Sequence, residues 1–217
     1  MRKKLVIWGA SGHALVVADA ARLGDEYEIA GFIDDVHPGR NGEEFRGAVI
    51  LGGREQLDVL SSQGVNNLVF GFGDCRARLE LAEFARRKGF RLATVIHPRA
   101  FVAADASVGC GTVILAGAIV NPATRIGENV IVNTSASVDH ECLIEDGAHI
   151  GPGVHLGGRV RVGRAAWIGI GATVIDRSSI GAEAVIGAGA VVVADIPGGV
   201  LAYGIPARVI KRVETNG

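Results

Sequence analysis

The chain has 217 residues, enough for one large or two small domains, and a formal net charge of −1, which argues against a general nucleic-acid-binding surface. No apolar run approaches the roughly 20 residues of a membrane span, and the start turns polar and Gly-rich too soon for a secretory signal. The three cysteines lack metal-binding spacing and favour a reducing compartment. We therefore expect a cytoplasmic protein that binds neither nucleic acid nor membrane.

The first part of the chain, 1–97, predicts a small α/β domain. An apolar run at 4–8 ends in a Gly-rich turn at 9–13, and a helical pattern follows over 14–23. Further strands are predicted at 28–33, 67–72 and 90–96, a helix at about 75–88, and a polar loop at 36–47. Strands that alternate with helices favour a small parallel, Rossmann-like sheet. His97-Pro98 marks its end, because proline disfavours helix before it.

Polar residues gather at the ends of three predicted strands. Ligands of open parallel sheets bind beyond the carboxyl ends of the strands, so these positions predict a binding site. The helix after Gly12 offers backbone N–H groups to phosphate, and the acidic pair suits a ribose hydroxyl or a base edge. The candidates are Ser11, Gly12, His13, Asp34, Asp35 and Gly73.

A bound dinucleotide is the alternative ligand for this domain. Its fingerprint is G-x-G-x-x-G, but residues 9–14 read GASGHA and lack the second glycine. A domain of about 97 residues is also small for a dinucleotide, so a mononucleotide-type ligand is favoured. A turn without any ligand would need its glycines as well, since tight turns require them.

The second part, 98–198, carries sixteen aliphatic residues at a constant spacing of six. This period matches neither an amphipathic helix nor an alternating strand, and it is typical of a hexapeptide parallel β-helix. With three strands per coil it predicts a little over five coils, followed by a tail at 199–217. We attribute the glycine that often follows the aliphatic residue, as at Gly109 and Gly127, to the positive φ of tight corners. The aliphatic residues are Val102, Val108, Ile114, Val120, Ile126, Val132, Val138, Ile144, Ile150, Leu156, Val162, Ile168, Val174, Ile180, Ile186 and Val192.

One histidine within this repeat has an acid on each side, in Asp139-His140-Glu141. A neighbouring carboxylate orients the ring and favours a general base, so His140 is the strongest catalytic candidate. His149 follows half a coil later; the two cannot stack within one chain, but they could meet across the interface of a symmetric trimer. Asn133 is a candidate substrate contact. Trp167, one coil after His149, is either an interface filler or a cofactor wall.

The motifs GASGH, FIDD, GFGD, IHPRA and DHE, in that order, and the closing YGIPARVI resemble one family. It is the sugar acetyltransferase family that includes bacterial nucleotide-linked 4-amino-sugar N-acetyltransferases and sialic acid O-acetyltransferases. The resemblance covers essentially the whole chain. It implies a left-handed parallel β-helix, a homotrimer with active sites between neighbouring β-helices, and acetyl-CoA as co-substrate without a metal.

The resemblance also implies roles for individual residues. His140 would be the base, Glu141 would raise its basicity, and the backbone N–H of Gly158 would stabilise the oxyanion of the transition state. His149 would contact the acetyl group, and Ile170 and Ala188 the pantetheine arm. The strand-end candidates of the first domain would hold the nucleotide sugar. Relatives often carry Glu where this chain has Asp139, whose orienting role is therefore open.

The predicted function is N-acetylation of the 4-amino group of a UDP-, dTDP- or GDP-linked 4-amino-4,6-dideoxy sugar, in surface glycan or O-antigen biosynthesis. One alternative is an O-acetyltransferase acting on sialic acid or a similar sugar. Another is a non-catalytic or zinc-binding β-helix trimer, with His140, His149 and His155 as ligands across subunits. An acetyl-enzyme on Cys142 is disfavoured, because this residue takes a small inward position and is expected in the core.

Overall fold

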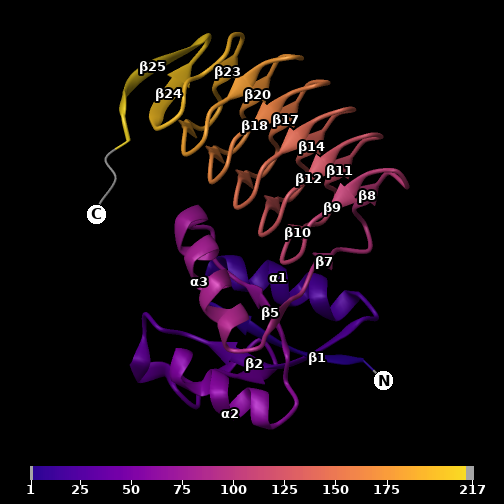
Figure 1. Ribbon diagram of the computed structural model, residues 1–217, viewed down its shortest axis with the longest axis vertical. Coiled ribbons are helices and arrows are strands. Elements are labelled where there is room, and N and C mark those ends of the chain that lie inside the picture. The colour runs from indigo at the N-terminus through magenta and orange to yellow at the C-terminus, as the bar shows by residue number, and fades with distance from the viewer. Residues whose placement is uncertain (1, 214–217) are drawn as a thin grey trace. The chain divides into compact units, whose positions relative to one another are not determined.

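The computed structural model describes residues 2–213, and the chain divides into two compact units, Met1–Pro98 and Arg99–Gly217. The roles that we assign to the two parts stay predictions. The first unit contains a parallel sheet of order β2-β1-β5-β6 with helices packed on it (Figure 1). Its elements are β1 Lys3–Trp8, α1 Gly12–Leu23, β2 Tyr27–Ile33, η1 Pro38–Arg40, β3 Glu44–Phe45, β4 Ala48–Val49, η2 Arg54–Gln56, α2 Leu57–Ser62, β5 Asn67–Phe70, α3 Cys75–Arg87, β6 Arg91–Leu92 and β7 Val95–Ile96.

Strand β1 is apolar along most of its length because both faces of this sheet are covered. Residues 5–7 are completely buried. Val6 and Trp8 belong to one apolar cluster with Leu57 of α2 and Ala82 of α3. The alternation of a strand turns Leu5 to the opposite face. Burial on both faces fixes the strand ends, and with them the loops that follow β1, β2 and β5.

Most predicted elements of the first unit are confirmed within two residues. The predicted 90–96 strand is instead two short strands, β6 and β7. The predicted loop at 36–47 contains the turn η1 and the short strand β3. Helix α2 was not predicted, because a six-residue helix offers only one pair of apolar residues at helical spacing, Leu57 and Leu60. Both side chains are buried, so tertiary contacts rather than local pattern account for this helix.

In the described part of the second unit, sixteen two-residue strands each end in one of the predicted aliphatic residues (Figure 1). Strands β8 to β20 each pair in parallel with the strand 18 residues further on, as Ser137 does with His155, so three strands make one coil. The predicted hexapeptide β-helix is confirmed. The strands are β8 Phe101–Val102, β9 Ser107–Val108, β10 Val113–Ile114, β11 Ile119–Val120, β12 Arg125–Ile126, β13 Ile131–Val132, β14 Ser137–Val138, β15 Leu143–Ile144, β16 His149–Ile150, β17 His155–Leu156, β18 Arg161–Val162, β19 Trp167–Ile168, β20 Thr173–Val174, β21 Ser179–Ile180, β22 Val185–Ile186 and β23 Val191–Val192.

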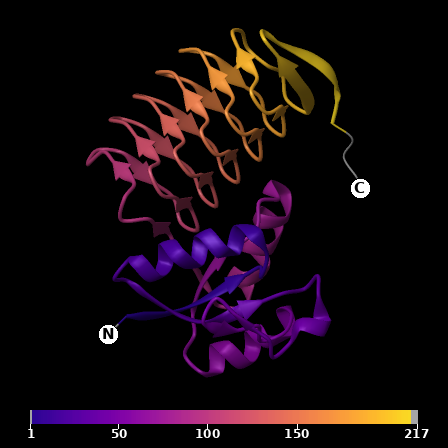
Figure 2. The same cartoon turned by 180° about the vertical axis from the view of Figure 1, so that it is seen from behind.

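The aliphatic residues fill the interior of the β-helix, and the small residues four positions later pack beside them. Viewed from behind, the coils again stack in register (Figure 2). Burying each such side chain contributes roughly 1.5–3 kcal/mol. Cys142 lies in this core with 2% of its surface exposed, as predicted. Burial raises the pKa of its thiol to about 11, which removes the thiolate that an acetyl-enzyme would need.

Our explanation of the glycine that follows the aliphatic residue was wrong. Positive φ occurs two residues later, for example at Gly111 and at the non-glycine residues Glu141 and Arg159. Gly109 instead lies against the next coil, where a Cβ atom would be 2.5 Å from the carbonyl carbon of Gly127. Glycine is needed at position 109 because the two coils approach too closely at this point for a side chain.

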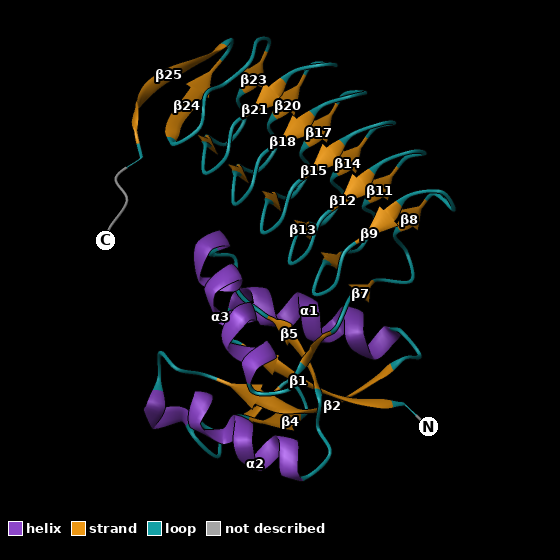
Figure 3. Cartoon of the chain, viewed as in Figure 1, coloured by secondary structure: helices purple, strands orange, loops and turns teal. Residues whose placement is uncertain are grey.

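The described part of the segment 199–217 continues the β-helix. Strand β24, Val200–Gly204, pairs in parallel with β22 and antiparallel with β25, Ala207–Arg212 (Figure 3). This hairpin extends the sheet that contains β16 and β19. Among the helices of the described residues, none is long and apolar enough to span a membrane.

Candidate active site

A pocket of about 320 Å³ lies at the carboxyl ends of the strands of the first unit. It brings together Ser11, Asp34 and Asp35, as the sequence predicts, and Trp8 and Phe72 add aromatic walls. Gly12, His13 and Gly73 are neighbours of this pocket in the sequence and are not among its lining residues. The pocket has a mostly apolar lining that also includes polar and charged side chains, which suits a nucleotide.

The buried carboxylate of Asp34 organises the loop that follows β2. Its Oδ1 accepts hydrogen bonds from the backbone N–H groups of Val36 and His37, and its Oδ2 lies 3.1 Å from His37 Nδ1 and 3.5 Å from an Arg40 nitrogen. Burial alone would raise the pKa of Asp34, but these hydrogen bonds outweigh it and hold the pKa below its usual range. Asp34 therefore shapes the pocket wall through its own turn.

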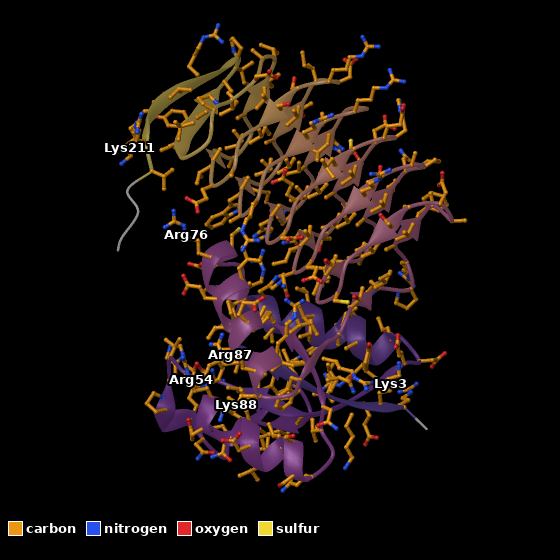
Figure 4. The ribbon with its side chains drawn as sticks, in the orientation of Figure 1. Lys3, Arg54, Arg76, Arg87, Lys88 and Lys211 are labelled. Carbon is orange, nitrogen blue, oxygen red and sulfur yellow. The ribbon has the colours of Figure 1, made fainter. Side chains whose placement is uncertain are left out.

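Asp35 anchors an arginine that the sequence analysis missed. Its carboxylate accepts from the Arg54 backbone N–H at 2.7 Å, from Arg54 Nε at 3.0 Å and from Trp8 Nε1 at 3.2 Å. Arg54 lies with Arg87 beside α3 in Figure 4, and their guanidinium carbons are 5.8 and 5.9 Å from the Phe84 ring centroid. The pocket thus has a fixed cation at its edge, and a direct ligand contact for Asp35 stays a prediction.

His13 stands in the first turn of α1, directly after the Gly-rich turn. Burial, and to a smaller extent the positive charge of Arg78, lowers its pKa to about 4. The imidazole is therefore neutral at physiological pH. A direct ligand contact for His13 stays a prediction, since this residue is not among those that line the pocket.

The His13→Gln variant is expected to remove part of the acid sensitivity of the fold. As pH falls from 6.5 to about 4, the unfolded chain binds a proton at His13 that the folded chain does not bind. The free energy of unfolding therefore falls over this window, by up to about 3 kcal/mol from this group. Urea titrations across the window measure it, with His155→Gln as a control at an exposed position. Equal pH slopes for wild type and His13→Gln would contradict this assignment.

His140 and Glu141 occupy the corner between β14 and β15, which is held from the coil below. Asp139 Oδ1 accepts from the His140 backbone N–H at 2.7 Å and from Asn121 Nδ2 at 3.1 Å. The Thr124 hydroxyl donates to the backbone carbonyl of Asp139 at 2.9 Å. Asp139 therefore fixes the backbone of the corner, and its carboxylate is not paired with the imidazole ring of His140.

The acid that contacts the ring is Glu141. Its Oε2 lies 3.0 Å from His140 Nδ1, and the guanidinium of Arg159 reaches the same oxygen at 2.8 and 3.0 Å. The hydrogen bonds from Arg159 and then from His140 hold the pKa of Glu141 below its usual range. An ionised carboxylate can only accept, so the proton of neutral His140 resides on Nδ1 and the lone pair on Nε2. That geometry suits a general base.

Gly158 lies one coil above, against the basic nitrogen of His140. A Cβ atom at this position would be 2.6 Å from His140 Nε2, so only glycine leaves the ring in place. The backbone of Gly158 and the candidate base therefore border the same small space. A donor next to a base is the arrangement that acyl transfer requires.

His149 lies on β16 and contacts a second candidate, Asn133. The Oδ1 atom of Asn133 accepts from the Thr134 backbone N–H at 2.8 Å, so its Nδ2 is the atom 3.1 Å from His149 Nε2. Because Nδ2 can only donate, Nε2 of His149 is an acceptor and the ring is the neutral tautomer with its proton on Nδ1. The Trp167 ring stacks on His149 with a centroid distance of 5.7 Å and an interplanar angle of 2°.

The candidates for the acyl donor share one groove on the β-helix. A pocket of about 350 Å³, almost entirely apolar, is lined by His149, Trp167, Ile170 and Ala188, together with Pro152. This lining suits the pantetheine arm. The corner that carries His140 is not part of the groove, since His149 belongs to the sheet of β13, β16 and β19 and β14 to another. Within the described residues, no group of three or more His, Cys, Asp or Glu side chains is placed to hold a metal ion.

The chain is similar to a known domain family and to several solved structures. Residues 4–84 match the PglD N-terminal domain family. PerB from Caulobacter crescentus, solved with CoA and GDP-perosamine, is 39% identical over 95% of this chain and 97% of that one, with a TM-score of 0.91. The acetyltransferase domain of PglB from Neisseria gonorrhoeae FA1090, solved with acetyl coenzyme A, is 38% identical over 97% and 100%, with a TM-score of 0.90. WeeI from Acinetobacter baumannii AYE shares the fold at 24% identity, 96% and 100% coverage and a TM-score of 0.77.

The chain belongs to the sugar acetyltransferases with a left-handed β-helix. The predicted family, fold class and enzyme class are thereby confirmed, and a non-catalytic trimer is no longer a competing description. The roles of the two groups of candidate residues in this acetyltransferase stay predictions that rest on geometry. The strand-end pocket is in its first unit, and the His140 corner and the His149 groove are in its second.

Arg159 of the acetyltransferase was not predicted from the sequence, although a signal was present. One coil of the β-helix is 18 residues, and Arg159 stands 18 residues after Glu141. Residues at this spacing lie one above the other, so an acid and a base there predict an ion pair. No comparable rule exists for Arg54 and Asp35, which are 19 residues apart across an irregular segment.

Proposed function

We propose that this acetyltransferase transfers the acetyl group of acetyl-CoA to the 4-amino group of a nucleotide-linked 4-amino-4,6-dideoxy sugar. The observation that carries the proposal is the His140–Glu141 pair with Gly158 against its basic nitrogen, in a chain 39% identical to a protein solved with CoA and GDP-perosamine. The product is an acetamido sugar for surface glycan or O-antigen assembly, made in the cytoplasm, where acetyl-CoA is available.

The mechanism that we propose is direct attack on the thioester. The amine nitrogen of the sugar bonds to the acetyl carbon while His140 Nε2 accepts the proton that the amine loses. The backbone N–H of Gly158 stabilises the oxyanion that develops on the carbonyl oxygen, a contribution worth about 10²–10³-fold in comparable enzymes. The carbon–sulfur bond then breaks, and the proton on His140 passes to the sulfur of the departing CoA.

A homotrimer is part of the proposal, because the two halves of the site lie on different sides of one β-helix. His140 stands at the corner after β14, whereas the His149 groove lies on the sheet of β16 and β19. An amine at His140 can meet a thioester in the groove if the groove belongs to a neighbouring subunit. Three copies then make three equivalent sites, each with residues from two chains.

The nucleotide sugar is proposed to bind in the pocket of the first unit. Its aromatic walls suit a nucleobase, and Ser11 and the N-terminus of α1 suit the diphosphate. The fixed guanidinium of Arg54 adds positive charge at the rim. These features support a nucleoside diphosphate and do not select among UDP, dTDP and GDP.

A thiol-release assay with acetyl-CoA tests this function. UDP-, dTDP- and GDP-linked 4-amino-4,6-dideoxy sugars serve as acceptors, with the corresponding 4-hydroxy sugars and sialic acid in parallel. Fast turnover with one amino sugar is expected, and mass spectrometry should show the acetamide product. Turnover only with a hydroxyl acceptor would replace the proposal with an O-acetyltransferase.

A further inference from the structure

A cation, Arg159, lies beside the corner that carries His140. Arg159 stands one coil above, and its backbone N–H donates to the His140 carbonyl at 2.9 Å. Its guanidinium meets Glu141 Oε2, the oxygen that also faces His140 Nδ1. Arg159, Glu141 and His140 thus form a continuous chain of contacts that ends at Nδ1, in the same ring as the basic Nε2.

We propose that Arg159 is a positioning residue that keeps His140 unprotonated at working pH by neutralising Glu141. A lone carboxylate beside an imidazole orients the ring but also favours the imidazolium, which cannot act as a base. A guanidinium on the same oxygen cancels much of that charge while leaving the Nδ1 contact intact. The proposal rests on the proposed role of His140 in catalysis.

The other charges near the corner do not replace this effect. On the same turn, the Asp139 carboxylate is used by the His140 backbone and by Asn121. In the coil below, the packed corner 121–124 carries no titratable side chain. In the coil above, the corner 157–160 contributes only Arg159. Cys142 is turned into the core, where its Sγ contacts the Gly157 carbonyl oxygen at 3.2 Å.

Arg177 provides a matched control. It occupies the position equivalent to Arg159 one coil further on, with the same φ of 61°, and its backbone N–H donates to the Gly158 carbonyl. Its side chain lies 3.9 Å from Asp176 and not at Glu141. A methionine at either position keeps the apolar stem and removes the guanidinium with its charge and its N–H donors. The two arginines therefore differ in whether the guanidinium contacts Glu141.

The experiment compares kcat/KM against pH for wild type, Arg159→Met, Arg159→Lys and Arg177→Met. For Arg159→Met we expect the acid limb of the profile to move to higher pH by roughly one unit. Arg159→Lys should restore most of the wild-type profile, and Arg177→Met should match it. In a Glu141→Gln background, Arg159→Met should no longer shift the acid limb, because Arg159 acts through that carboxylate.

Three results would overturn the proposal: an unshifted acid limb in Arg159→Met, an equal shift in Arg177→Met, or an undiminished arginine effect without Glu141. A lower rate with an unshifted profile would leave Arg159 with a purely structural role. An NMR titration of the His140 ring in the same variants gives a readout that does not depend on turnover. If wild type releases no thiol with any amino sugar, the proposed function fails, and this titration still decides the role of Arg159.

Discussion

The His140→Asn variant is expected to lose roughly 10²–10⁴-fold in kcat with the amino sugar that wild type acetylates. The physical reason is the loss of Nε2, the nitrogen whose lone pair faces Gly158 and which accepts the proton of the attacking amine. Asparagine has a similar size and polarity but offers no base in that place. Thiol release under saturating acetyl-CoA measures the effect.

Measuring the free energy of unfolding distinguishes a loss of catalysis in His140→Asn from a loss of folded protein. The His140 side chain is about half exposed, and the corner is held by backbone bonds and by Asp139, so the free energy of unfolding should change little. His155→Asn is the matched control, since His155 lies on β17, in the sheet of β14, and its Nδ1 contacts the Ser137 hydroxyl. An unchanged kcat in His140→Asn would mean that the amine arrives already deprotonated and that His140 only positions it.

The β-helix could be predicted in detail because one physical constraint repeats. Each strand buries one aliphatic side chain in a narrow interior, so a single error in spacing would expose it. The same constraint places side chains 18 residues apart one above the other. It predicts Trp167 on the same face as His149, one coil along, and the two rings do stack. The role of the glycines could not be predicted in this way, since close approach between coils and positive φ both select glycine.

The first unit shows where sequence patterns stop being informative. The strand ends were predicted because long buried strands leave a strong signal, and Ser11, Asp34 and Asp35 do line one pocket. The partners of those aspartates were not predicted. The carboxylate of Asp34 accepts hydrogen bonds within its own turn, and that of Asp35 accepts them from Arg54. These contacts depend on irregular segments that have no sequence period. Only geometry therefore separates candidate ligand groups from structural ones. Asn133 and His149 likewise contact each other through the stacking of coils and not through a local motif.

Gly158→Ala is expected to reduce kcat by about 10²-fold, comparable to moving a catalytic group by 1 Å. The added Cβ would lie 2.6 Å from His140 Nε2 and 2.7 Å from Cε1, so the ring has to leave its position. Gly158 has a φ outside the left-handed region, so alanine brings no backbone strain. The effect should appear in kcat with little change in the free energy of unfolding, and Gly39→Ala, in open space, is the control.

A double-mutant cycle gives the sharper test. If alanine at position 158 acts by displacing the imidazole, it has little left to remove once His140 is asparagine, and the two losses should be far from additive. If the losses multiply, Gly158 contributes through something other than the position of the base. Non-additivity would tie the backbone of one coil and the side chain of the coil below to one catalytic unit. That result would also explain physically why the repeat carries a glycine at this corner, where the Arg177 coil carries Asp176.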